Sequence, residues 1–348
     1  MDRVKLVDKA NTLIGCLHSL QTTSGRRRDS KRDGKTLDVP NPFIIDEGKL
    51  LGSKAFRLLE WKTQVVTTPG NPFLRNRKTH VLEVVSCSVM TANILGLNVG
   101  LARAIAIGHD IGHVPFGHPG EDFLRKAMDR PEFCHEVMGP IIAQKIERRG
   151  NGLDLTHETL TGMMCHSGAR ARAGMTPEAW AVRFCDKIAY IFADYNDLIV
   201  RMKFPARLEL RQLMDEFGEN QRERTTTAMA GLIVESAESR KVVFDQSEVA
   251  EKFKQLREFM YEIYPRIIIQ DPEPMMGPVL RFLENLKICD PYLMLALMTD
   301  KDVAFLARQP AIDFSHIQQT PLAEFLPRIE HIAPPDRPID MCNPYLDW

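Results

Sequence analysis

Apolar residues recur at helical spacing along most of this 348-residue sequence, and alternating, Val-rich runs joined by hairpin turns are nearly absent. In the segment 78–96, Val84, Met90 and Leu95 share one apolar side, and Gly96 follows as a stop signal. The other segments with helical character are 99–110, 138–149, 156–166, 177–200, 223–240, 247–263, 276–288 and 291–308. The sequence therefore predicts an all-α fold.

Composition and charge exclude several classes of protein. Hydrophobic residues make up 44% and charged residues 26%, which is ordinary for a globular chain, and the net charge of -1 gives no field that favours nucleic acid or an acidic membrane. No apolar run is long enough to cross a membrane, and the first fifteen residues do not resemble a signal peptide. Seven cysteines without a CxxC pair indicate reduced thiols. We expect a cytoplasmic protein with no membrane partner.

The chain is expected to have three parts. Residues 1–42 include a basic stretch, SGRRRDSKRDGKTLDVPNP, which is either a solvated arm or an arm that meets phosphate on a nucleotide or nucleic acid. Residues 43–200 form a helical core, in which 50–66 has helical spacing and a Pro/Gly/Asn loop follows. Residues 201–348 form a C-terminal helical region packed on that core, and the segment 334–348 is an irregular tail.

The chemistry concentrates in one stretch, AIGHDIGHVPFGHPGED, residues 106–122. His109 and Asp110 end an apolar helix there, and Gly112 favours a turn that lets both side chains meet one ion. His80 and Asp186, which lie on other helices, are the candidates for the remaining ligands. Two histidines and two carboxylates suit a first-row divalent cation such as Mn, Fe, Co, Ni or Zn.

The helix of Asp186 carries three further polar side chains. Tyr190 and Asp194 follow Asp186 on one face, and Lys187 is adjacent. An acid, a phenol and a second acid on a pocket wall suit a sugar or nucleoside, with the lysine near phosphate. The alternative is that Tyr190 belongs to the core and Asp194 is a solvated acid.

These residues carry a resemblance to a known family. The order His80, His109–Asp110, Asp186 resembles that of HD-domain phosphohydrolases. The resemblance is closer to one branch, the dGTPase-like deoxynucleoside triphosphate triphosphohydrolases, through strings that occur in the same order over residues 43–306: FRLLEWKTQVV, LEVV, LGLN, AIAIGHDIGHVPFGHPGE, LTHETLTGMMCHSG, VRFCDKIAY and LMTDKDVAFLA.

The resemblance implies an HD-domain helical fold with additional C-terminal helices, one divalent cation per site (Mn, Mg, Fe, Co, Ni or Zn, with Mn the ion most expected to support activity in vitro) and a role for each matching residue. The metal ligands it implies are His80, His109, Asp110 and Asp186, and the catalytic dyad is His118 with Glu121. The substrate contacts it implies are Gln64 and Asp194 at the deoxyribose 3′-hydroxyl, Tyr190 under the sugar, and Arg77, His113, His135 and Lys187 at the phosphates.

The implied activity is hydrolysis of a deoxynucleoside triphosphate, either dGTP or several dNTPs, to the deoxynucleoside and inorganic triphosphate. Two alternatives stay open: an HD-type nucleoside monophosphate phosphatase or phosphodiesterase, and a regulator that binds a nucleotide or single-stranded nucleic acid. Family members are usually homo-oligomers, often hexamers, and some bind an allosteric nucleotide. This sequence departs from the bacterial pattern at Lys187, where an acid is usual, and after His135, where HNEQ is usual.

Overall fold

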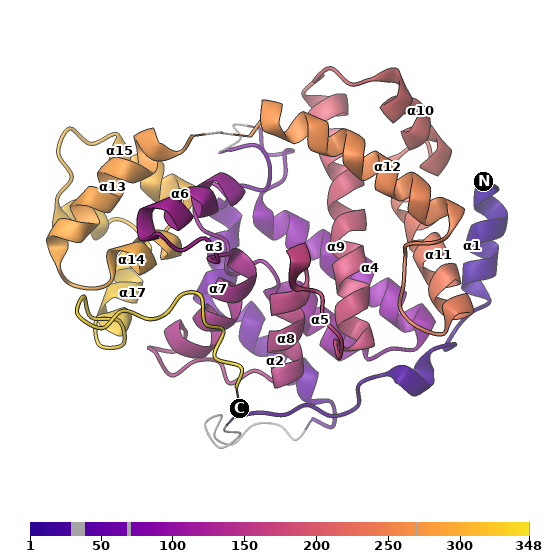
Figure 1. The fold of residues 1–348 in the computed structure, drawn as a ribbon, viewed down its shortest axis with the longest axis horizontal. Coiled ribbons are helices and arrows are strands. Elements are labelled where there is room, and N and C mark those ends of the chain that lie inside the picture. Colours follow the sequence, from indigo (N-terminus) through magenta and orange to yellow (C-terminus); the bar gives the residue numbers. More distant parts are fainter. Residues whose placement is uncertain (29–38, 68–70, 269–270, 348) are drawn as a thin grey trace.

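Helices form nearly all of the regular structure in a computed structural model that describes residues 1–28, 39–67, 71–268 and 271–347. Over these residues the chain forms seventeen α-helices, and its extended pairing is limited to one bridge between Thr63 and Asn76. The predicted all-α fold is therefore confirmed (Figure 1).

Three helices form the centre of the molecule and carry the metal-ligand candidates: α4 (Arg77–Leu95), α5 (Val99–Gly108) and α9 (Pro177–Tyr195). α4 packs against both α5 and α9. The Asn76 side chain accepts a hydrogen bond from the Thr79 N–H at 2.9 Å and caps α4, and Gly96 ends it with φ at 79°. The predicted helix over 78–96 is confirmed.

Shorter helices surround this centre, and three of them begin at a histidine: His118, His135 and His157. They are α2 (Pro42–Leu51), α3 (Lys54–Leu58), η3 (Leu59–Trp61), α6 (His118–Met128), α7 (His135–Ile141), η4 (Ile142–Ile146), α8 (His157–Cys165) and η5 (Gly168–Arg170). α8 packs on α5, α7 and α9, so its C-terminal end lies beside the residues that follow α5.

The remaining helices lie at two ends of the molecule (Figure 1). At one end α1 (Arg3–Asn11) packs on α11 (Gln221–Ser239), beside α10 (Leu208–Phe217) and α12 (Glu248–Ile263). At the other end are α13 (Glu273–Leu286), α14 (Pro291–Leu297), α15 (Asp300–Ala307) and α17 (Leu322–Ile329). The short elements η1 (His18–Leu20), η6 (Asn196–Arg201), η7 (Tyr264–Arg266) and α16 (Phe314–Ile317) complete the chain. Residues 201–348 thus contribute to both ends, and the division of the chain into three parts stays a prediction.

The helical prediction for 50–66 is wrong in its second half. α3 and η3 end at Trp61, and the chain continues without helix through the segment that contains Gln64. Tertiary hydrogen bonds replace helical ones there: the Thr63 N–H donates to Asp300 Oδ2 at 2.9 Å, and the Lys62 amine donates to the carbonyl oxygen of His113. Apolar spacing alone does not report such distant partners.

Part of the basic stretch is attached to the core. Arg27 lies 2.7 Å from the fully buried carboxylate of Asp46, and its guanidinium also donates to the carbonyl oxygen of Pro42. Residues 29–38 of the predicted arm lie outside the described residues. A role for the arm in binding phosphate stays a prediction.

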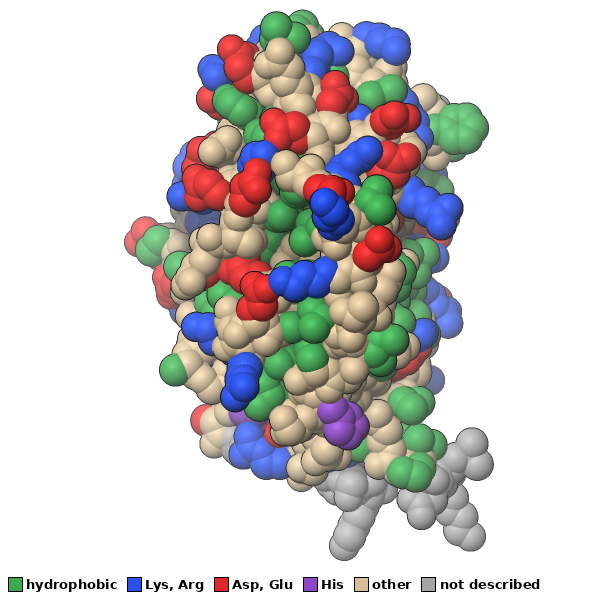
Figure 2. Space-filling view, turned by 90° about the vertical axis from the view of Figure 1, so that its right-hand side faces the viewer, with side chains coloured by type: hydrophobic (Ala, Val, Ile, Leu, Met, Phe, Trp, Pro, Cys, Tyr) green, Lys and Arg blue, Asp and Glu red, His purple; other side chains and the backbone are tan. Residues whose placement is uncertain are grey.

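The surface has mixed charge on the face shown in Figure 2, where Lys and Arg side chains lie among Asp and Glu, with apolar side chains between them. In the part of the chain that the structure describes, no helix combines the length and the apolar character that crossing a membrane requires.

Candidate active site

Four side chains meet at the centre of the molecule: His80 in the first turn of α4, His109 and Asp110 directly after α5, and Asp186 in α9. His80 Nε2 lies 3.1 Å from Asp186 Oδ1, and His109 Nε2 lies 3.4 Å from Asp110 Oδ1. His80 Nε2 also lies 3.9 Å from Asp110 Oδ2, and His109 Nε2 lies 3.8 Å from Asp186 Oδ1. The structure therefore brings the four predicted ligands together. We call them the four-donor cluster.

The four-donor cluster has the chemistry to hold a divalent cation. His109 Nδ1 lies 2.7 Å from the carbonyl oxygen of Ala106, which fixes the proton on Nδ1 and directs the Nε2 lone pair into the cluster. That Nε2 is buried and has no hydrogen-bond partner among the described residues. An unpartnered buried nitrogen facing two carboxylates is a feature that a bound cation explains.

Neighbouring groups lower the pKa of both carboxylates of the cluster and so favour their ionised form. Burial raises the pKa of Asp186, but the hydrogen bond with His80 and the interactions with His109 and His80 outweigh burial and hold that pKa well below its usual value. Burial likewise raises the pKa of Asp110, but its interactions with His109, Arg77 and His113 outweigh burial and hold that pKa well below the ordinary range. The cluster thus offers two negative charges to a cation.

A second group of histidines adjoins the cluster. Glu121 Oε1 lies 2.8 Å from His135 Nδ1, and His135 Nε2 lies 3.3 Å from His166 Nε2. The rings of His113 and His135 stack with centroids 3.6 Å apart. Burial lowers the pKa of His135, but Glu121 and Glu136 raise it to about 9, whereas burial, Arg77 and His135 lower the pKa of His113 to about 4. The carboxylates thus favour the charged form of His135, whereas burial and the neighbouring cations favour the neutral form of His113.

His118 is the histidine that is exposed in the cavity, at the first position of α6. Its ring centroid lies 5.5 Å from that of His113 and 5.6 Å from that of His135. Among the described residues, Glu121 makes its hydrogen bonds with His135 and Arg125. The pairing of His118 with Glu121 therefore stays a prediction, and the imidazoles that lie against Glu121 are those of His135 at 2.8 Å and His113 at 3.3 Å.

Two predicted substrate contacts lie near the entrance to the cluster. Arg77 lies 2.7 Å from Asp110 Oδ2 and donates through Nε to the carbonyl oxygen of Thr63 at 3.0 Å. The Gln64 side-chain oxygen is buried without a hydrogen-bond partner among the described residues and lines the cavity. Arg77 is thus held against a cluster carboxylate, whereas Gln64 has an unpartnered acceptor.

The opposite wall comes from α9 and α12. The hydroxyl of Tyr190 lies 2.7 Å from that of Tyr261, and Asp194 accepts a hydrogen bond from the Tyr264 hydroxyl at 2.7 Å. Arg75 also contacts Asp194. Burial raises the pKa of Asp194, with Arg75 opposing that rise. Burial lowers the pKa of Lys187 to about 7, and its amine donates to the carbonyl oxygen of Arg183 at 2.9 Å.

These residues surround one cavity of about 640 Å³. Every predicted site residue lines it except His109 and Glu121, which lie behind its wall. The cavity also has lining residues that were not predicted from the sequence, among them His166, Arg183, Arg257, Tyr261 and Tyr264. Arg257 and Tyr261 in α12 and Tyr264 at the start of η7 recur at helical spacing, and His166 stands in the string MMCHSG. Both patterns were present in the sequence.

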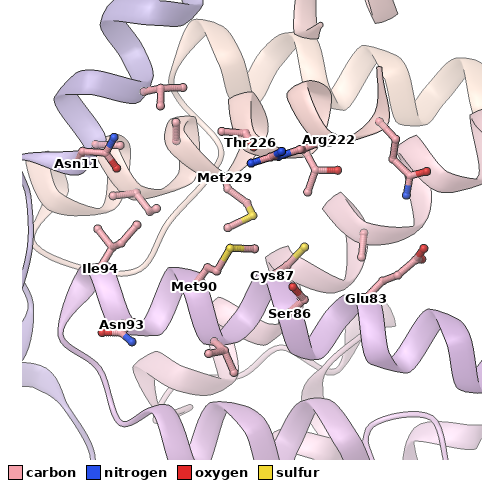
Figure 3. A pocket seen from close by; sticks show the side chains of 18 residues that line it. Asn11, Glu83, Ser86, Cys87, Met90, Asn93, Ile94, Arg222, Thr226 and Met229 are labelled. Carbon is pink, nitrogen blue, oxygen red and sulfur yellow. The ribbon is translucent and has the colours of Figure 1, made fainter. Parts of the chain in front are cut away.

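A second cavity, of about 800 Å³, lies between α1, α4 and α11 (Figure 3). Met90, Cys87 and Met229 face its interior, and its charged lining residues among those described are Glu83 and Arg222. Its described lining contains no histidine. The histidine and aspartate donors that suit a divalent cation therefore line the 640 Å³ cavity described above.

Asp300, at the start of α15, connects the site to the C-terminal part of the chain. Its Oδ1 accepts a hydrogen bond from the Phe116 N–H at 2.8 Å, and its Oδ2 accepts from Thr63. Phe116 has φ at 63°, so the loop before His118 takes an unusual backbone conformation there. One carboxylate thus holds both chain segments that precede His118 and Gln64.

Comparison with known proteins agrees with this site. Residues 77–191, from α4 to α9, match the model of the HD domain. The chain is 34% identical over 261 residues to a deoxyguanosinetriphosphate triphosphohydrolase-like protein of Clostridium tetani, covering 72% of this chain and 73% of that one. It is 36% identical over 240 residues to the protein of that name from Caldanaerobacter subterraneus subsp. tengcongensis, with 69% of each chain covered.

The fold and the site thus define an HD-domain protein with a buried His/Asp cluster of the kind that binds a metal. The extent and level of identity show more: the chain belongs to the deoxyguanosinetriphosphate triphosphohydrolase-like family.

Proposed function

We propose that this protein hydrolyses a deoxynucleoside triphosphate to the deoxynucleoside and inorganic triphosphate. The observation that carries the proposal is the position of the four-donor cluster on the wall of a 640 Å³ cavity that also contains cationic and phenolic side chains. A cation in the cluster supplies a Lewis acid for an α-phosphate oxygen. The names of the relatives make dGTP the first substrate to test.

The chain's own residues bind the anionic part of the substrate. Arg183, Arg257 and Lys187 line the cavity on the α9 and α12 side, and Arg77 faces them from α4. Burial lowers the pKa of Lys187 to about 7 in the absence of substrate, and a polyanion beside the amine favours its charged form. These cations neutralise the phosphates and orient the α-phosphate toward the four-donor cluster.

His118 handles the proton in this proposal. Water forms the new bond to the α-phosphorus, the bond from phosphorus to the 5′-oxygen breaks, and the 5′-oxygen takes a proton. A histidine exposed in the cavity at the start of α6 is placed to receive the proton of the water or to donate one to the 5′-oxygen. Glu121, through its hydrogen bond to His135, orients the neighbouring imidazole.

The sugar lies against α9 in this arrangement. Tyr190, held by Tyr261, packs under the deoxyribose and leaves no room for a 2′-hydroxyl, which accounts for a preference for deoxy substrates. The unpartnered oxygen of Gln64 accepts a hydrogen bond from the 3′-hydroxyl. The Asp194 carboxylate already accepts a hydrogen bond from Tyr264 and forms an ion pair with Arg75. Its contact with the 3′-hydroxyl therefore uses a remaining lone pair of a carboxylate oxygen.

The test is a product analysis. The protein is incubated with each of the four dNTPs and with GTP, in Mn²⁺, Mg²⁺, Co²⁺ or Fe²⁺, under aerobic and anaerobic conditions, and the products are separated by ion exchange. We expect deoxynucleoside and triphosphate from at least one dNTP and no product from GTP. His118→Gln removes the activity, whereas His331→Gln, at an exposed position, keeps it.

Two other functions give different results in that assay. Release of orthophosphate or pyrophosphate alone, or turnover of nucleoside monophosphates, identifies a phosphatase or phosphodiesterase. Binding of single-stranded DNA that survives Asp110→Ala, with no turnover in any metal, identifies a nucleotide or nucleic-acid binding regulator. The homo-oligomer, the allosteric nucleotide, manganese as the preferred ion and a cytoplasmic location stay predictions.

A further inference from the structure

Arg75, two residues before α4, is a buried arginine that lies against three carboxylates. Its Nε lies 3.0 Å from Asp197 Oδ2, its Nη1 lies 2.7 Å from Glu83 Oε2, and its Nη2 contacts Asp194 Oδ1. Each nitrogen of the guanidinium thus has a carboxylate of its own. Because the guanidinium is planar and rigid, it fixes the positions of the three carboxylates relative to one another.

The three carboxylates differ in what they face. Asp194 lines the 640 Å³ cavity that is assigned to the substrate. Asp197 lies in η6, and Glu83 lines the other cavity from α4 (Figure 3). Arg75 is not among the described residues that line the substrate cavity. An effect of Arg75 on a bound substrate therefore passes through Asp194.

The Asp194 carboxylate is held at both of its oxygens. Oδ1 contacts Arg75, and Oδ2 accepts a hydrogen bond from the Tyr264 hydroxyl at 2.7 Å. Because each carboxylate oxygen accepts more than one hydrogen bond, these partners fix the plane of the group and leave acceptor capacity for a ligand in the cavity. Arg75 and Tyr264 together thus determine where the Asp194 acceptor lies.

Arg75 also favours the ionised form of that carboxylate. Burial raises the pKa of Asp194, and the charge of Arg75 is the largest influence that opposes the rise. Without the arginine, the cost of burying an uncompensated negative charge favours the protonated carboxyl, which presents a donor where the ionised form presents an acceptor. The acceptor that Asp194 offers to the cavity therefore depends on Arg75.

We propose that Arg75 is a positioning residue for recognition of the substrate 3′-hydroxyl, and that it acts through the Asp194 carboxylate that it holds in place. This inference rests on the proposed function, in which Asp194 accepts a hydrogen bond from that hydroxyl. A site built to hydrogen-bond a hydroxyl discriminates strongly against the analogue that lacks it. The preference for a dNTP over its 2′,3′-dideoxy analogue therefore measures how well Asp194 is placed.

The experiment measures kcat/KM for the dNTP that the protein hydrolyses best and for the matching 2′,3′-dideoxynucleoside triphosphate. We expect the parent to prefer the dNTP by at least about 100-fold and Arg75→Met to prefer it by about 10-fold or less. Arg75→Lys keeps the charge but cannot reproduce the three-way contact, so we expect a preference between these two values. The matched control is Arg201→Met, which removes an arginine 2.6 Å from Asp197 Oδ1 and is expected to keep the preference of the parent.

A double-mutant cycle separates positioning from general support of the fold. Asp194→Asn removes the anionic acceptor, so we expect Arg75→Met to change the dNTP preference of that variant by less than about twofold. Circular dichroism verifies that each variant is folded, and Arg75→Lys provides the test if Arg75→Met does not fold. A folded Arg75 variant that loses kcat/KM equally for both triphosphates overturns the proposal, and so does a further loss of preference in the double variant.

The two proposals fail separately. Hydrolysis of dNTPs with a preference that the Arg75 variants leave unchanged keeps the proposed function and rejects the role of Arg75. If no dNTP is hydrolysed, the proposed reaction is rejected, and calorimetric binding of 2′-deoxyguanosine and 2′,3′-dideoxyguanosine makes the same comparison. Discrimination that Arg75→Met or Arg75→Lys weakens then supports the role of Arg75, whereas discrimination equal to that of the parent, or none in the parent, rejects it.

Discussion

At Gly112 the loop after α5 touches the start of α7 so closely that no side chain fits between them. A Cβ there would lie 2.1 Å from the His135 carbonyl oxygen and 2.3 Å from the Gly139 nitrogen, both backbone atoms that cannot move aside cheaply. We expect Gly112→Ala to lower the free energy of unfolding by about 3 kcal/mol. Urea denaturation measures this.

A glycine with free space provides the control for that substitution. In α2, a Cβ on Gly48 would meet no atom within 4 Å, so Gly48→Ala is expected to raise the free energy of unfolding by about 0.5–1 kcal/mol through helix propensity alone. Equal unfolding midpoints for Gly112→Ala and the parent would contradict the contact.

Lys62 is a buried amine behind the same loop, and its pKa makes stability depend on pH. Burial lowers the pKa to about 8, with Asp300 opposing that shift, whereas the ordinary value is 10.5. Between these two values the unfolded chain binds more protons than the folded chain, so the Lys62 contribution to the free energy of unfolding increases as pH rises from 8 to 10.5. Below pH 8 Lys62 is charged in both the folded and the unfolded chain, so the free energy of unfolding is lowered by the full cost of burying that charge.

The measurement compares the parent with Lys62→Met in urea at pH 8 and pH 10. We expect the stability of the parent relative to this variant to be greater at pH 10. Lys78→Met, which removes a partly exposed amine from α4, controls for the loss of one positive charge. A difference between parent and Lys62→Met that stays constant with pH would show that Lys62 is not the responsible group.

At the scale of elements, α15 acts on the site through the position of one carboxylate. Asp300 joins the segments that precede His118 and Gln64, although it contacts neither side chain in the cavity. It is therefore a positioning residue. We expect Asp300→Ala to lower kcat/KM in the triphosphate assay on the order of 100-fold, because displacement of a catalytic side chain by about 1 Å has an effect of that size.

Asp302 in the same turn gives a matched control. Its carboxylate accepts from the Thr299 N–H at 2.8 Å, within the capping box of α15, so Asp302→Ala is expected to cost about 1 kcal/mol in stability with little change in kcat. A loss of kcat that is equal in the two variants, at equal melting temperatures, would show that Asp300 acts only by stabilising α15.

The helices were predictable where local signals agree, and the exceptions have identifiable causes. α4 begins and ends within one residue of the predicted bounds because Asn76 and Gly96 supply both caps. The predicted helix over 291–308 is interrupted because Thr299 caps a new helix, α15, after α14. Residues 62–66 are not helical because their hydrogen-bond partners, Asp300 and His113, lie far along the chain.

At the scale of the whole molecule, the metal-ligand candidates were predictable and their neighbours were not. Each candidate ligand stands in a distinctive local string, so its residue type and spacing carry the information. The contacts of Glu121 with His135 and of His135 with His166 depend on how α6, α7 and α8 pack around α5. Packing of that kind involves long-range contacts, which a pattern of local residues does not specify.

Because the four-donor cluster joins α4, the end of α5 and α9, a cation bound there stabilises the centre of the fold. A ligand that binds only the folded chain raises the free energy of unfolding by about 2.7 kcal/mol at a concentration 100 times its Kd. We therefore expect Mn²⁺ to raise the melting temperature of the chelator-treated protein by a few degrees in scanning calorimetry. Asp110→Asn and Asp186→Asn, each of which removes one anionic ligand, are expected to abolish most of that rise, whereas Asp245→Asn, at an exposed position, keeps it.

An equal rise in all three variants would place the stabilising cation outside the cluster, and no rise in the parent would show that the four donors do not hold Mn²⁺.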